Sequence, residues 1–140
     1  MSEQTFDQIW TDFYDEVGID MAATLSLEPV SGSPEAVSVR MPLTEANRQP
    51  AGMFSAPALF GLADITGTFL ARYHVPEGVF PFAIQANINL LSNTGAGYAT
   101  ATATLVRAGR SVVVTQTEVR DDQGKLLTTV SATYLPKKVG

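Results

Sequence analysis

Six apolar residues near the N-terminus share one face of a helix, at spacings of three and four: Phe6, Ile9, Trp10, Phe13, Tyr14 and Val17. Thr5, with Gln8 three residues later, predicts a capping box at the start of this helix, and Gly18 suits its end. The acidic residues of the segment fall on the other face. We therefore predict an amphipathic helix over residues 6–17 that packs on a core; a docking face for a partner is the alternative.

Four segments of different character follow: predicted strands at 21–30 and 36–43, a polar loop at 44–54 and a long helix at 56–73. In the second strand, apolar and polar residues alternate, as in a strand with one buried face. Apolar residues occupy nearly every side of the long helix, and Pro57 stands in its first turn, where proline is tolerated. This pattern predicts a helix buried inside the protein.

Beyond the long helix the apolar pattern has a period of two. It predicts four strands joined as a meander, at residues 84–90, 98–106, 111–120 and 126–135. Turns rich in glycine and aspartate separate the later strands, and Pro136 ends the last one. Only a curved sheet covers a helix that is apolar on nearly every side. We therefore predict an α+β fold in which about six antiparallel strands wrap the long helix.

Composition narrows the chemistry of the chain. Its 140 residues, 45% of them apolar, suffice for one domain with a core. The absence of cysteine excludes disulfides and thiolate metal sites, and a single histidine excludes a histidine-rich metal site. The nine basic residues form no cluster suited to a nucleic-acid backbone. We expect no metal, no nucleic-acid partner, and one domain over 1–140, divided into an N-terminal helical segment (1–19) and a core (20–136).

One apolar stretch, residues 53–71, approaches the length of a membrane span. Asp64 lies at its middle, where a charge opposes insertion by about 2.5–3.5 kcal/mol, so a helix buried in protein is the better interpretation. The N-terminus lacks the basic residues and apolar run of a secretory leader. Together with the lack of cysteine, this predicts a cytoplasmic protein with no membrane partner.

Asp64 is the main candidate for catalysis. A carboxylate beside Leu62 and Ile65 is costly to bury without a partner. Burial also raises the pKa of a carboxyl group toward the range of a general base. The structural alternative is an ion pair with Arg40 or Arg72, and the residues alone leave both interpretations open.

Two further places could hold parts of a substrate. At the start of the long helix, the N–H groups of Ser55 and Ala56 are candidate donors to an oxyanion, because Pro57 has none. Arg107 and Arg110 flank a hairpin turn and are candidates for binding phosphate groups. The alternatives are an ordinary loop entry and a solvated turn.

Three segments together resemble the hotdog-fold acyl-CoA thioesterases of the phenylacetate-degradation type. They are the run from Gly52 to Leu62-Ala63-Asp64, the strand Asn87-Ile88-Asn89-Leu90-Leu91, and Gly109-Arg110 with residues 118–126 on the closing hairpins. The resemblance spans about residues 20–135 and implies a hotdog fold, in which a curved antiparallel sheet surrounds the long helix.

The resemblance also implies roles for residues. Asp64 matches the catalytic carboxylate, which acts as nucleophile or activates water, and Gln49 stands where many members have an asparagine that helps place the thioester. The His-Gly-Gly motif that supplies the oxyanion donor in the family is replaced here by Ser55-Ala56-Pro57, so the Ala56 N–H is the expected donor.

The resemblance further implies assembly and ligand contacts. A homodimer, or a homotetramer, would place each active site at a subunit interface, with Asp64 of one subunit facing the helix start of the other. Arg107 and Arg110 match a hairpin that often contacts the CoA phosphates. Near Phe82 some members carry a water-orienting hydroxyl, which this chain lacks. No metal or organic cofactor is implied.

We therefore expect hydrolysis of an acyl-CoA or similar acyl thioester, in a pocket lined by Phe54, Phe60 and Phe82. The alternative is a non-catalytic module that binds acyl-CoA or another apolar ligand. A hotdog dehydratase would pair a histidine with an acidic residue, and His74 lies at the wrong end of the long helix for that role.

Overall fold

A computed structural model describes residues 4–139, so residues 1–3 of the predicted segment 1–19 and Gly140 lie outside the described part. Its elements, in chain order, are α1 (Phe6–Val17), α2 (Met21–Thr24), β1 (Glu28–Gly32), β2 (Ala36–Pro42), α3 (Ala56–Arg72), β3 (Val79–Leu90), β4 (Tyr98–Ala108), β5 (Val113–Arg120) and β6 (Leu126–Lys138). These elements confirm the predicted α+β class. Within residues 4–139, no helix is both long and apolar enough to cross a membrane.

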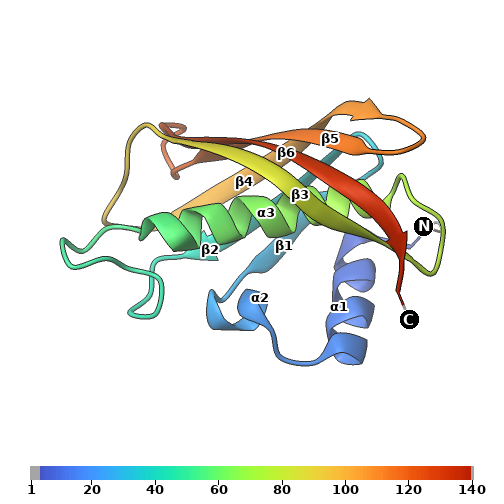
Figure 1. The fold of residues 1–140 in the computed structure, drawn as a ribbon. Helices are drawn as coiled ribbons and strands as arrows, with labels where there is room; N and C mark the ends of the chain where they lie inside the picture. The colour runs from blue at the N-terminus through green and yellow to red at the C-terminus, as the bar shows by residue number, and fades with distance from the viewer. Residues whose placement is uncertain (1–3, 140) are drawn as a thin grey trace.

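One antiparallel sheet of six strands, in the order β1-β2-β4-β5-β6-β3, curves around α3 (Figure 1). The predicted meander is correct for β4, β5 and β6 but wrong for β3, which pairs with β6 at the far edge of the sheet. Residues 91–97 carry the chain from this edge past the start of α3 to β4 (Figure 1). This connection is longer than the two to five residues typical of a hairpin, so it can span the distance from the edge strand β3 to β4.

The helix α1 has the predicted bounds. The Thr5 hydroxyl accepts a hydrogen bond from the Gln8 N–H at 3.3 Å, and Gly18 ends the helix with a φ of 85°. The apolar face packs on the core, with three residues buried: Phe6, Ile9 and Trp10. Trp10 stacks on Phe69 of α3 with ring centres 4.9 Å apart, so α1 is fixed to the end of the long helix.

The strand predicted over 21–30 is wrong in its first part, because Met21–Thr24 form the short helix α2. The Asp20 side chain accepts from the Ala22 N–H at 2.8 Å and so caps this turn. The strand itself begins only at Glu28. A one-turn helix that depends on its cap leaves no apolar period in the sequence, whereas the neighbouring apolar residues mimic a strand.

The helix α3 lies in the concave side of the sheet (Figure 1). Ser55 caps it, and Tyr73, the last residue of the predicted range 56–73, is its C-terminal cap. Alanines of β4 at 99, 101 and 103 are completely buried, and β4 packs against α3. Their small side chains let the helix lie close to the sheet. The predicted wrapping of the long helix is thus confirmed.

The strand β6 continues past Pro136 to Lys138, although the sequence predicts that the strand ends at this proline. β5 reaches only to Val113, which pairs with Tyr134 of β6. Beyond that point β6 pairs with β3 alone, so Pro136 can do without an N–H group on its other side.

Candidate functional site

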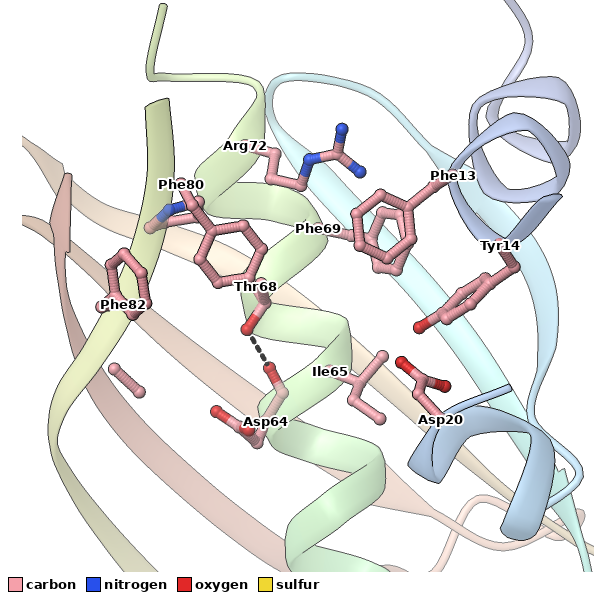
Figure 2. Close-up of a pocket in the computed structure, with 12 residues that line it drawn as sticks. Phe13, Tyr14, Asp20, Asp64, Ile65, Thr68, Phe69, Arg72, Phe80 and Phe82 are labelled. Carbon is pink, nitrogen blue, oxygen red and sulfur yellow. Dashed lines mark hydrogen bonds between the residues drawn. The ribbon is translucent and has the colours of Figure 1, made fainter. Parts of the chain in front are cut away.

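Asp64 lies in the middle of α3, half-buried, at the wall of a pocket of about 200 Å³ between α3, β3 and α1 (Figure 2). Most of the lining is aromatic or aliphatic: Phe13, Ile65, Phe69, Phe80, Pro81, Phe82 and Ala83. The remaining lining residues are polar: Tyr14, Asp20, Thr68 and Arg72. The lining of the pocket therefore suits an apolar group that lies beside a carboxylate.

Asp64 has no cationic partner among residues 4–139. Arg40 instead pairs with Glu28 at 2.8 Å. The Arg72 guanidinium lies over the Phe13 ring, 4.4 Å from its centre, and points away from Asp64 (Figure 2). The ion pair that the sequence left open is therefore not formed. Burial raises the pKa of the Asp64 carboxyl above its usual range, and a hydrogen bond from Tyr134 partly opposes this shift.

Tyr134 of β6 and Thr68 of α3 are polar neighbours of Asp64, and the Thr68 hydroxyl donates to the Asp64 carbonyl oxygen at 2.8 Å (Figure 2). The Tyr134 hydroxyl lies 3.1 Å from the Asp64 carbonyl oxygen and 3.5 Å from the carboxylate Oδ1, with the proton donated by the tyrosine. Tyr134 is completely buried, and burial raises its pKa, so the hydroxyl stays protonated as a donor. Gly67 leaves room for it, since a Cβ at that position would lie 2.5 Å from the hydroxyl oxygen. Tyr134 was not expected at the site, because in the sequence it looks like one more apolar position of a strand.

At the start of α3, only one of the two candidate N–H donors is free. The Ser55 N–H donates to the Asn47 carbonyl oxygen at 2.8 Å, and the Ser55 hydroxyl accepts from the Ala58 N–H at 3.2 Å. The Ala56 N–H has no partner among the described residues, as expected for a first-turn group. Within the chain, Ala56 is therefore the better donor for an oxyanion.

Gln49 and Ala56 line a second pocket, at the N-terminal end of α3. The Gln49 side-chain oxygen accepts from the Ala51 N–H, which holds the loop before α3. The Asn93 amide donates to the Phe54 carbonyl oxygen at 2.8 Å and ties the loop after β3 to the same place. These two hydrogen bonds hold the backbone on both sides of this pocket.

The two pockets are separate within one chain. Asp64 is eight residues beyond Ala56 on the same helix, which corresponds to about 12 Å along its axis. Gln49 and Ala56 do not line the Asp64 pocket, and Asp64 does not line theirs. A single chain thus does not bring the carboxylate and the free N–H to one reacting carbon.

The other candidate residues lie away from both pockets. Arg107 and Arg110 are exposed at the turn between β4 and β5, toward the C-terminal half of α3 (Figure 1), and line neither pocket within the described residues. The His74 Nε2 forms a hydrogen bond with the Pro34 carbonyl oxygen at 2.7 Å. His74 therefore ties the end of α3 to the turn between β1 and β2.

The predicted aromatic lining is divided between the pockets. Phe82 lines the Asp64 pocket, Phe54 lines the second pocket, and Phe60 lines neither. Phe13 and Tyr14 of α1 were not expected at the site, although they lie on the apolar face that the helical period predicts. The apolar period of a helix predicts which of its faces is buried, but it does not predict which part of the protein that face covers.

A sequence model described as the thioesterase superfamily matches residues 51–128. The 1,4-dihydroxy-2-naphthoyl-CoA hydrolase of Listeria monocytogenes is 29% identical over 115 residues, which are 82% of this chain and 94% of that protein. A provisionally named esterase of Vibrio cholerae is 32% identical over 91 residues, which are 65% of this chain. Those residues span 61% of the Vibrio protein, less than two thirds of its length.

Solved structures share the fold at low sequence identity. A thioesterase from Haemophilus influenzae superposes with a TM-score of 0.85 at 22% identity, over 91% of this chain and 90% of that one. The PaaI protein of the phenylacetic acid degradation operon of E. coli gives a TM-score of 0.78 at 22% identity, over 94% and 93%. The arrangement of sheet and helix that the resemblance implied is therefore confirmed.

Proposed function

This chain belongs to the thioesterase superfamily, and from that premise we propose that it hydrolyses an acyl-CoA or a similar acyl thioester. The observation that carries the proposal is the half-buried Asp64 carboxylate, which borders a mainly apolar pocket without a cationic partner among residues 4–139. A module that only binds its ligand gains nothing from such a group, because an unpaired buried carboxylate costs stability.

In the proposed reaction the acyl group occupies the Asp64 pocket, and the thioester carbon lies next to the carboxylate. The deprotonated carboxylate either takes a proton from an attacking water and passes it to the leaving thiolate, or attacks the carbonyl carbon itself and forms an anhydride that water then hydrolyses. The Tyr134 hydroxyl holds Asp64 in place from the buried side. The carbonyl oxygen becomes negative as the new bond forms, so it needs an N–H donor before the thiol leaves.

We propose that a second copy of the chain supplies that donor, the Ala56 N–H, together with Gln49 to place the thioester. β3 supports this assembly, because it is an edge strand with a free ladder and apolar side chains in solvent. Phe82, Ile84 and Leu90 are 41%, 56% and 53% exposed. The proposed assembly is a homodimer, or a homotetramer of two such dimers.

Arg107 and Arg110 are the proposed contacts for the CoA phosphates. Both are exposed, and neither forms an ion pair within the described residues. Two guanidinium groups at one turn suit a phosphate, since their planar donors bind its oxygens in pairs. The proposed location is the cytoplasm, because the absence of cysteine fits a protein that needs no disulfide bonds.

The test is release of free thiol from acetyl-, hexanoyl-, palmitoyl- and phenylacetyl-CoA by the wild type and by Asp64→Asn. We expect turnover of at least one substrate by the wild type and its loss in the variant, with the oligomeric state unchanged. Asp7→Asn, on the exposed side of α1, is the matched control and should keep full activity. Full activity of Asp64→Asn would contradict the mechanism. No turnover by the wild type, with CoA thioesters still bound, would favour the binding module.

A further inference from the structure

We propose that the N-terminal helix α1 sets the size of the acyl group, with Phe13 and Tyr14 as specificity-determining residues that close the Asp64 pocket. The ligand class is an acyl thioester with a compact acyl part, of about one ring or an equally short chain. The inference rests on the proposed function only for the name of the reaction, since the pocket and its wall are independent of turnover.

The position of α1 makes it a wall of the site. Phe13 and Tyr14 project from α1 toward α3 and line the pocket opposite Phe80 and Phe82 of β3 (Figure 2). Asp64 lies between these two walls on α3 (Figure 2). An acyl chain that enters past Asp64 therefore meets the aromatic residues of α1 at its far end.

The wall is held in place by ring contacts. The Phe13 ring packs edge-on against Phe69 of α3, with centres 5.4 Å apart, and the Arg72 guanidinium covers it at 4.4 Å. Tyr14 packs against Phe13 at 4.9 Å and against Trp10 at 4.8 Å. Each aromatic or guanidinium contact of this kind stabilises the cluster beyond the stabilisation that burial of the rings provides. A longer acyl chain would have to displace this cluster.

The volume limits what the pocket accepts. An apolar protein cavity of about 150 Å³ holds one benzene molecule. The Asp64 pocket, at about 200 Å³, therefore has room within its walls for one ring or a short chain, and a palmitoyl chain would extend beyond it. The wall also belongs to a segment that precedes residue 51, where the match to the superfamily begins. The N-terminal segment therefore supplies one wall of the pocket, and the lining residues from Asp64 to Ala83 lie in the matched region.

Phe13→Ala removes a ring that lines the pocket and should therefore enlarge the pocket on the side of α1. We measure kcat/KM for hexanoyl- and decanoyl-CoA, and expect their ratio to move toward decanoyl by about tenfold or more, as pockets discriminate chain length by contacts of this kind. Asp12→Ala, on the exposed face of the same helix, should leave the ratio unchanged. An unchanged ratio in a folded Phe13→Ala protein would overturn the inference.

Trp10 gives a second readout that needs no turnover. It is the only tryptophan of the chain and contacts both Tyr14 and Phe69, which line the pocket. Titration of the full-length protein with S-hexyl-CoA, a thioether that cannot be hydrolysed, should change its emission and saturate. S-decyl-CoA should bind at least tenfold more weakly to the wild type, and Phe13→Ala should remove the difference.

The two proposals fail in different ways. If the wild type binds S-hexyl-CoA over S-decyl-CoA but hydrolyses no thioester, the proposed function is wrong and the size limit stands. If the wild type hydrolyses thioesters but binds both thioethers equally, the size limit set by α1 is wrong and the proposed function stands. Unaltered Trp10 emission of the unliganded Asp12→Ala protein checks that α1 remains docked in this control.

Discussion

Replacing Gly67 with alanine tests the contact between α3 and Tyr134 that positions Asp64. The added Cβ would lie 2.5 Å from the Tyr134 hydroxyl oxygen and 3.1 Å from Thr115 Oγ1. Tyr134 has no exposed surface, so its ring cannot swing into solvent. The hydroxyl must therefore shift from Asp64, or the helix must move away from the sheet.

Two opposing effects set the magnitude. Overpacking a buried site costs about 1–3 kcal/mol, whereas alanine in a helix is favoured over glycine by about 1 kcal/mol. The net change of Gly67→Ala is therefore a loss of about 0–2 kcal/mol. Tyr134→Phe alone should cost about 1 kcal/mol through its lost hydrogen bond. Because it also removes the atom that Cβ would strike, the double variant should be more stable than the sum of the single changes by about 1–2 kcal/mol.

Urea unfolding of the four proteins measures this coupling energy. Gly61→Ala is the matched control, because its Cβ would meet only the flexible end of Leu25, at 2.9 Å. We expect this control to be neutral or stabilising. Additive single changes at Gly67 and Tyr134 would refute the argument, since they would show that the hydroxyl does not fill the space that glycine leaves.

Three further predictions concern the site and its assembly. Tyr134→Phe removes a hydrogen bond that lowers the pKa of Asp64, so the acidic limb of kcat/KM should move to higher pH, and an unmoved limb would contradict the contact. Because the pKa of Asp64 is raised in the folded protein, ionisation of Asp64 lowers the stability of the fold. This loss of stability is absent below the unfolded pKa of about 3.9 and grows as pH rises through the folded pKa. Asp64→Asn should therefore gain stability relative to the wild type between pH 4 and pH 8 in thermal unfolding, and a constant difference would count against it. Ile84→Lys, on the exposed edge strand, should shift sedimentation toward the monomer and reduce turnover, whereas an active monomer would disprove the shared site.

Much of the fold follows from local patterns along the chain. The bounds of α1 and α3 were predicted almost to the residue, because their apolar spacing and caps are properties of neighbouring residues. The place of β3 in the sheet was not predicted correctly. Its apolar period indicates a strand but does not indicate which strand it pairs with. The error over 21–30 arose because a one-turn helix is specified by a single cap, Asp20.

The residues of the candidate site likewise include some that local sequence predicts and some that it does not. Asp64 could be named from the sequence because a carboxylate in an apolar helix is conspicuous, and its catalytic role stays a prediction. Tyr134 could not be named, since it lies 70 residues from Asp64 and meets it only after the sheet closes on α3. Phe13 belongs to the same class, because its burial was predicted but the pocket it closes depends on the docking of α1 on Phe69.

The pairing of β3 with β6 has a consequence for the order of events during synthesis. β3 leaves the ribosome well before β6, its neighbour in the described sheet, which starts at Leu126. Until β6 has emerged, a segment with apolar residues such as Ile84 and Leu90 has no partner strand in the sheet. Pairing across so long a loop is slow compared with local contacts. The nascent chain is therefore most exposed to mispairing in the interval between the emergence of β3 and that of β6.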